Sequence, residues 1–376
     1  MRTLIRDVRV FDGVRAVASA DVLIDGDSIA EPDGRSADVE LDGAGKTLLP
    51  GLIDAHTHTF DGSLARALTY GVTTELDMFC LPSNLRRQRK LAAERDDVAD
   101  LRSAGVLATA PGGHPTGVMA ATATMLDNPQ DAAGAFETIT EPAQAESFVA
   151  ARVAEGSDYL KVVIDDGALA GTPVPALGRN IATALVDAAR TAGLKTIAHA
   201  CTARETALAL DAGVDGLAHV WADTPSGDPA ADALAARLAD QGVFVVSTLA
   251  YFESIGGESP DRLAGAAHVA GVLRRAGVPL LAGTDANPFA PRNGDGLHRE
   301  LELLVHAGLS PLEALAAGTS VTARHFGLPD RGRVSPGLRA DLLLVDGDPT
   351  RDITAVRAVA DVWRRGIRQR GIRRSS

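Results

Sequence analysis

An apolar run that ends in two histidines occupies residues 48–58 of this 376-residue chain, with the sequence LLPGLIDAHTH. From this point on, short apolar runs alternate with Ala-, Leu- and Arg-rich stretches of helical period, which is the pattern of a parallel βα array. The runs predict strands at residues 48–58, 72–79, 104–110, 159–165, 195–200, 214–220, 243–249 and 278–285. Eight strands close an α/β barrel, so the predicted fold class is α/β, a (β/α)8 TIM barrel.

Both ends of the chain have β character outside this array. Residues 1–47 form a pattern of short alternating strands separated by turns, and an alternating pattern returns after residue 332. We expect the two ends to pair into one small composite β-sandwich. The predicted domains are therefore a first sandwich part at 1–47, the barrel at 48–331, and a second sandwich part at 332–376 that includes a basic tail from Arg364.

Helix boundaries are clearly marked in several places. The helical stretches 181–193 and 203–213 each end at a glycine, the residue best suited to a left-handed C-terminal position. The sequence SPLE at 310–313 combines a capping box with a proline at the first helical position. It predicts a helix that runs from there to about Phe326.

Composition and charge narrow the classes of function. With 45% hydrophobic and 23% charged residues, the chain has the composition of an ordinary globular protein rather than a disordered or fibrous one. The 37 Lys and Arg residues stand against 49 Asp and Glu residues and leave a net charge of -12. This charge repels nucleic acids and anionic membranes, so a small-molecule partner is favoured.

The cysteines and the apolar runs predict the compartment. Cys80 and Cys201 lie far apart, which excludes a disulfide scaffold and is typical of a reducing setting. The N-terminal residues lack the apolar segment of a signal peptide, and no run is long enough for a membrane span. We therefore expect a cytoplasmic protein without a membrane partner.

His56 and His58 form a His-x-His pair at the end of the first predicted barrel strand. Side chains at positions i and i+2 of a strand point the same way, so the two imidazoles converge on one point. Imidazole is a preferred ligand of zinc and other transition metals, and barrel enzymes place their sites at the carboxyl ends of the strands. A pair in a surface loop is the alternative interpretation.

Lys161 lies inside the apolar run YLKVVI at 159–164, where a charged ammonium is poorly solvated. Burial there is expected to lower the pKa of the side chain and to make a neutral amine available, which carbon dioxide can carboxylate. The carbamate is an anion with two oxygens that can bridge two cations. The alternative is a lysine that reaches the barrel rim or pairs with Asp165 or Asp166.

Three more polar residues end predicted strands. His199 ends the fifth strand, His219 the sixth, and Asp285 the eighth, where a carboxylate can ligate a metal and accept a proton. Singly, each histidine is more often structural, and Asp285 could cap the following segment. Together with the first three candidates, however, they fall at the same end of five different strands, which favours a metal site.

These landmarks resemble the metal-dependent amidohydrolase superfamily along essentially the whole chain. The motifs that carry the resemblance are PGLIDAHTH at 50–58, Lys161, His199, His219, GTD at 283–285 and GLRADL at 337–342. Within the superfamily, the chain is most similar to the imidazolonepropionase-like and Xaa-Pro-dipeptidase-like group. The resemblance implies a barrel flanked by a split β-sandwich, and it also implies homo-oligomers as a common assembly.

The resemblance further implies a binuclear centre of two divalent ions, most often Zn²⁺, with Fe, Co or Mn as alternatives. One ion would be held by His56, His58 and Asp285, the other by His199 and His219, with carboxylated Lys161 bridging the two. The corresponding hypothesis is that a hydroxide bridging the metals attacks a carbonyl. Asp285 then passes a proton to the departing nitrogen.

Four further residues are candidates for contacts with the substrate. His114, in the sequence GGH at 112–114, resembles a substrate-contacting loop of the group and is the candidate donor to the oxyanion. Trp221, Tyr251 and Asn287 follow the strand ends, with packing at the barrel rim or, for Asn287, a turn as the alternative. Structural positions are expected for the histidines of helical stretches, His268, His298, His306 and His325.

The predicted function is hydrolysis of a carbon–nitrogen bond, of non-peptide or dipeptide type, in a small molecule. A lactonase uses the same metal chemistry and stays open as an alternative. A mononuclear deaminase should not need Lys161 and commonly carries a glutamate where this chain has Thr202. A non-catalytic binding protein would be favoured by a missing ligand, and none is missing. A serine hydrolase is disfavoured because the chain has no G-x-S-x-G motif.

Overall fold

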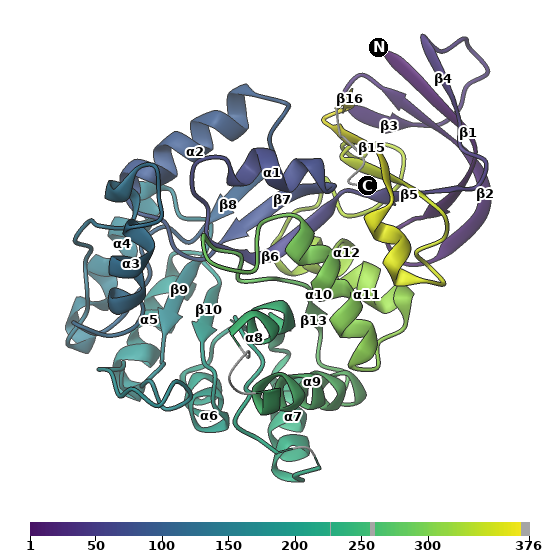
Figure 1. Ribbon diagram of the computed structural model, residues 1–376. Coiled ribbons are helices and arrows are strands. Elements are labelled where there is room, and N and C mark those ends of the chain that lie inside the picture. The colour runs from purple at the N-terminus through teal and green to yellow at the C-terminus, as the bar shows by residue number, and fades with distance from the viewer. Residues whose placement is uncertain (226, 256–259, 370–376) are drawn as a thin grey trace.

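In the computed structural model, which describes residues 1–225, 227–255 and 260–369, helices surround two sheets of parallel strands (Figure 1). The first sheet has the order β6-β7-β8 and the second the order β13-β12-β11-β10-β9. Their strands are β6 (Leu52–Thr57), β7 (Val72–Asp77), β8 (Asp100–Ser103), β9 (Leu160–Val163), β10 (Thr196–His199), β11 (Gly216–Leu217), β12 (Phe244–Val246) and β13 (Leu280–Leu281).

The two sheets meet at both edges, although the ladder between them is not continuous. A parallel bridge joins Ala108, after β8, to Val162 in β9, and another joins Thr57 in β6 to Ala286, after β13. Backbone hydrogen bonds cross the same seams, for example from the Ala55 N–H to the Ala282 carbonyl at 3.0 Å. The arrangement is thus of the TIM-barrel type, but single bridges replace the paired strands of a fully closed barrel at the seams.

The expected strand at 48–58 is in fact two strands that belong to different sheets. β5 (Lys46–Pro50) pairs with the terminal strands described below, and β6 begins the barrel. Gly51 separates them, and a Cβ atom there would lie 2.2 Å from Thr73 Oγ1. The close approach to the neighbouring strand explains why the chain needs glycine at this point.

The third strand also differs from the prediction of 104–110. It is β8, four residues earlier, and the predicted segment contributes only the bridge at Ala108. β8 has the charged sequence DLRS, which does not resemble a buried strand. Its first residue, Asp100, is nevertheless compatible with a sheet because its carboxylate pairs with Arg331 and Arg339.

Helices lie outside the parallel strands and pack their apolar faces against them (Figure 1). They are α1 (Ser63–Thr69), α2 (Pro82–Glu94), α3 (Thr116–Ala123), α4 (Ala145–Glu155), α5 (Arg179–Thr191), α6 (Ala203–Ala212), α7 (Ala230–Gln241), α8 (Leu249–Ile255), α9 (Pro260–Arg275), α10 (Asp295–His306), α11 (Pro311–Ala317) and α12 (Ser320–His325). Within the described residues, no helix is long and apolar enough to cross a membrane.

The helix expected from 310 to Phe326 begins as predicted but is interrupted. Ser310 caps α11, and its Oγ accepts a hydrogen bond from the Glu313 N–H at 3.2 Å. The helix stops before Gly318, and α12 then continues to His325. The interruption leaves the Gly318 carbonyl free to accept a hydrogen bond from the Ile53 N–H at 2.8 Å, which ties this segment to β6.

The strands of the two chain ends form one eight-stranded sheet beside the barrel (Figure 1). Its order is β16-β15-β14-β5-β1-β2-β3, and β4 pairs with β1. The strands are β1 (Arg2–Phe11), β2 (Ala16–Asp25), β3 (Ser28–Ala30), β4 (Val39–Asp42), β5, β14 (Leu342–Asp346), β15 (Val359–Arg364) and β16 (Ile367–Arg368). The pairing of the two ends agrees with the expectation, but the strands pair in one sheet and not in two.

The predicted basic tail does not begin at Arg364. This residue ends β15, and its side chain is buried beside Asp100 and Asp341. An arginine can be part of a sheet here because carboxylates of the barrel and of the terminal segment compensate its charge. The remainder of the predicted tail, residues 370–376, lies outside the described residues.

Candidate metal centre

The six predicted ligands come from the carboxyl ends of five parallel strands and line one cavity of about 210 Å³. β6 carries the first histidine of the pair, and the second follows this strand directly. β9 carries Lys161, and β10 carries His199. His219 follows β11, and Asp285 follows β13. The six residues are His56, His58, Lys161, His199, His219 and Asp285.

His56 and Asp285 face each other in an arrangement that calls for a cation. His56 Nδ1 lies 3.0 Å from the Ala218 carbonyl, which can only accept, so this nitrogen carries the proton. Burial lowers the pKa of His56 well below its ordinary value, so Nε2 stays unprotonated. Nε2 lies 3.2 Å from Asp285 Oδ1, and two acceptors therefore meet.

The charge of Asp285 strengthens this requirement. Burial raises the pKa of its carboxyl group, but the nearby histidines outweigh burial and leave the pKa below its ordinary value. The same Oδ1 atom lies 3.0 Å from Nε2 of His58, which also approaches it from the end of β6. One ionised carboxylate oxygen thus lies between two imidazole nitrogens, as in a set of metal ligands.

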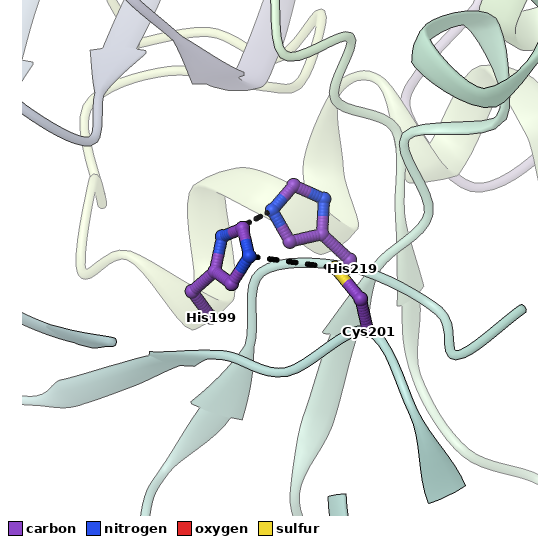
Figure 2. Close-up of side chains that lie close together, drawn as sticks. All are labelled: His199, Cys201 and His219. Carbon is purple, nitrogen blue, oxygen red and sulfur yellow. Dashed lines mark hydrogen bonds between the residues drawn. The ribbon is translucent and has the colours of Figure 1, made fainter. Parts of the chain in front are cut away.

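A second pair of histidines meets next to His56 and Asp285. His219 Nε2 lies 3.0 Å from His199 Nδ1, and the two ring centroids are 4.5 Å apart (Figure 2). Two atoms bound to one zinc ion at about 2 Å in a tetrahedron lie about 3.3 Å apart. The spacing of these nitrogens, and that of the pair His56 and Asp285, therefore fits metal ligation.

Lys161 has the environment that the sequence predicts. Its Nζ is buried, and no hydrogen-bond partner for it occurs among the described residues. Burial lowers the pKa of the amine to about 7, so a large fraction is neutral near neutral pH. An unpartnered neutral amine inside a cluster of candidate metal ligands is the form that can be carboxylated.

Residues 47–372 match the amidohydrolase family. The chain belongs to the amidohydrolase family. The prediction from the sequence motifs is therefore confirmed. Imidazolonepropionase from Cereibacter sphaeroides is 43% identical over 77 residues, which are 20% of this chain and 19% of that protein. This chain thus matches only about a fifth of the length of this curated relative.

Solved structures of similar overall fold cover nearly the whole amidohydrolase. A Xaa-Pro dipeptidase with bound methionine in the active site has a TM-score of 0.79 at 21% identity, covering 99% of this chain and 100% of that chain. Phenylurea hydrolase B has a TM-score of 0.81 at 21% identity, covering 98% of this chain and 97% of that chain. These structural similarities support the assignment of the TIM-barrel-type fold to this chain.

Other residues, which the sequence motifs did not single out, hold the candidate ligands of the amidohydrolase in place. Asp54 accepts hydrogen bonds from the His56 N–H at 3.2 Å and from the Thr284 hydroxyl at 2.7 Å. It thereby links the two motifs that supply the acceptor pair. Asp54 lies inside the motif PGLIDAHTH and Thr284 inside GTD, so their nearness in sequence to the candidate ligands could have identified them.

His199 has two neighbours that the prediction also missed. Cys201 Sγ lies 3.4 Å from its Nε2, and Cys201 and His219 lie on the same side of the ring (Figure 2). Asp165 Oδ2 lies 3.6 Å from the same nitrogen. With Nε2 directed at these groups, the Nδ1 atom faces the cluster. The spacing of Cys201, two positions after His199, was a local signal, whereas the contact with Asp165 depends on how β9 and β10 lie side by side.

His114 lies at the cavity as expected. Its ring centroid is 4.6 Å from that of His199, and its Nδ1 is 3.6 Å from Asp165 Oδ2. Burial lowers the pKa of His114 to about 3, so the ring is neutral at neutral pH and keeps one N–H donor.

The other three candidates for substrate contacts have different surroundings. Tyr251 lines the cavity beside His219, at 6.3 Å between ring centroids. Asn287 also lines it, but its amide donates to the Asp285 and Ala290 carbonyls and thus shapes a turn.

Trp221 does not lie at the cavity, which corrects the prediction. It is fully buried in the hydrophobic core, and its Nε1 donates to Thr224 Oγ1 at 3.0 Å. The residue follows His219 by two positions, but the strand β11 has already ended, so the alternation of a strand does not extend to it.

Proposed function

We propose that this amidohydrolase is a metal-dependent hydrolase that cleaves an amide carbon–nitrogen bond of a small molecule. The observation that carries the proposal is the pair of acceptors formed by His56 Nε2 and Asp285 Oδ1, 3.2 Å apart. Two buried acceptors in contact repel each other unless a cation lies between them. A divalent ion satisfies both.

The remaining donors suit a second ion. We assign His56, His58 and Asp285 to one divalent metal, His199 and His219 to the other, and carboxylated Lys161 to both. Zinc fits the nitrogen and oxygen donors, and iron, cobalt or manganese fit them as well. When bound, the metals supply a water of lowered pKa and polarise the substrate carbonyl.

The chain's own residues provide proton transfer and orientation. Asp285 presents a carboxylate at the centre of the cluster, where it accepts a proton and returns it to the departing nitrogen. His114 faces the same cavity with one N–H donor, and it stabilises the negative charge that develops on the carbonyl oxygen. Tyr251 limits the space above His219 and orients the substrate.

Metal content tests the proposal directly. Elemental analysis of the purified protein is expected to give about two equivalents of metal per chain. Lys161→Ala should lower this content together with hydrolytic activity. Lys90→Ala is a matched control because Lys90 is an exposed lysine outside the cavity, and it should change neither. A metal-free protein that retains activity would overturn the proposal.

The reaction type requires a substrate panel. Neutral anilides, N-acyl amino acids, Xaa-Pro dipeptides, cyclic amides and lactones present the metal centre with C–N or C–O bonds. The proposal expects at least one amide to be cleaved with a higher kcat/KM than any lactone. Exclusive hydrolysis of lactones would assign the same centre to C–O bonds.

A further inference from the structure

Apart from the candidate metal ligands, part of the cavity wall is apolar. Phe79 and Leu81 line it from the segment after β7, Leu107 from the segment after β8, and Met119 from α3. All four belong to one buried hydrophobic cluster, and a further aromatic ring packs edge-on against Phe79. A substrate group that lies along this wall loses contact with water and gains apolar contacts.

The mouth of the same cavity is apolar too. Val118, Ile255 and Phe289 line it and are 49%, 40% and 44% exposed. They are three of the nine exposed large hydrophobic side chains in the described part of the chain. Because exposed apolar groups that gather at one opening mark a binding site, this grouping points to an apolar ligand that enters here.

Charged partners for a substrate carboxylate are missing from this wall. Among the described residues that line the cavity there is no arginine, and Lys161 is the one lysine, deep within the metal ligands. Asp131 is the lining carboxylate outside that cluster. Arg87 and Asn128 already engage it, the latter at 3.1 Å. A free carboxylate on the substrate would therefore be buried without a cation beside it.

We propose that the substrate of this enzyme is uncharged and carries an apolar acyl or aryl group, which lies along the wall of Phe79, Leu81, Leu107 and Met119. This inference rests on the proposed function, since it places the scissile bond at the metal ligands. It selects neutral anilides and related amides over N-acyl amino acids and dipeptides, which carry a free carboxylate.

Three anilides that differ in the presence and the place of a carboxylate test the inference. Hexananilide is neutral, the monoanilide of adipic acid has a carboxylate in place of the terminal methyl group, and N-hexanoyl-4-aminobenzoate has one on the ring. The neutral compound should be cleaved with a kcat/KM at least about tenfold higher than either charged one, because burying an unpaired charge is costly. A carboxylate compound cleaved equally well would overturn the inference.

A variant at the rim should shift the preference towards the charged substrate. Val118→Arg adds a cation at an exposed position of the mouth, so it should lower kcat/KM for hexananilide and raise it for the adipic monoanilide. Val153→Arg, on α4 and 47% exposed, adds the same charge outside the cavity and should leave both values unchanged. Equal responses of the two variants would also count against the inference.

Binding separates this inference from the proposed function. Hexanohydroxamic acid and adipic monohydroxamic acid carry the same metal-binding group and differ in charge at the far end. If no anilide is cleaved, calorimetric titration of the holoenzyme with this pair still decides the inference. Tighter binding of the neutral hydroxamate supports it, and equal or weaker binding refutes it, whatever bond the enzyme cleaves.

Discussion

His219 Nδ1 lies 2.9 Å from Thr248 Oγ1, so the hydroxyl fixes the orientation of an imidazole whose other nitrogen faces His199. Thr248 has a φ of 49°, in the left-handed region that β-branched residues avoid. A residue is held in this conformation only when its surroundings enforce it, and such residues gather at functional sites. We infer that the backbone is strained here to present the hydroxyl to the histidine.

Replacing Thr248 by valine should therefore weaken metal binding without removing a ligand. Loss of a hydrogen bond to a ligating histidine typically costs about 10- to 100-fold in metal affinity. Competition with a chelator measures the affinity, and Thr248→Ser should restore most of it because the hydroxyl is kept. An unchanged affinity in Thr248→Val would show that the contact does not orient His219.

Substitution by phenylalanine should affect stability at Trp221 and catalysis at Tyr251. Trp221→Phe leaves a space in the core, so it should lower the free energy of unfolding by about 2 kcal/mol and leave KM unchanged. Tyr251→Phe should instead change kcat/KM with little effect on stability, since this residue lines the cavity. Urea denaturation and steady-state kinetics distinguish the two results. A raised KM in Trp221→Phe would return this residue to the substrate site.

Asp100 connects the barrel to the terminal segment and should matter greatly for stability. Its carboxylate lies 3.1 Å from Arg339 and 3.4 Å from Arg364 and also contacts Arg331. Asp100→Ala would remove the carboxylate that three guanidinium groups share and leave only Asp330 and Asp341 to compensate them, which is expected to cost on the order of 3 kcal/mol.

Asp97→Ala is the matched control for this substitution. Asp97 is 59% exposed on its side chain and pairs only with the neighbouring Arg95 among the described residues. Surface pairs contribute little, so its loss should change the unfolding free energy by about 0.5 kcal/mol or less. Equal urea midpoints for the two variants would contradict a connecting role for Asp100.

His298 should make the protein less stable in acid. Its Nε2 lies 2.8 Å from the Tyr70 carbonyl, and burial lowers its pKa to about 4. The unfolded chain takes up this proton near pH 6.5, so between pH 6.5 and 4 the unfolded state binds more protons than the folded one. The unfolding free energy therefore falls as the pH falls through this window, by up to about 3 kcal/mol.

His298→Gln tests this pH dependence because glutamine keeps an N–H donor for the Tyr70 carbonyl but does not titrate. The slope of the unfolding free energy between pH 4 and 6.5 should be smaller in this variant than in the natural protein. His306→Gln, at an exposed position of the same helix, should leave the slope as it is. An unchanged slope in His298→Gln would assign the acid sensitivity to other groups.

The candidate ligands could be selected from the sequence because their signal is local. Apolar runs that end in His or Asp predict side chains at strand ends, and parallel strands bring those ends to one edge. The boundaries of strands were less predictable where the local hydrophobic pattern disagrees with the pairing of the strands. The charged segment DLRS forms β8 because Asp100 meets three arginines from the far end of the chain.

By itself, the sequence determined the order of the parallel strands, the candidate ligands and the family, because hydrophobic period and motif spacing are properties of short segments. Only the tertiary structure decided that His56 and Asp285 meet as two acceptors, that Trp221 turns into the core, and that the cavity wall is apolar. The physical reason is that these features arise from contacts between segments far apart in the chain, whose distances no local pattern encodes.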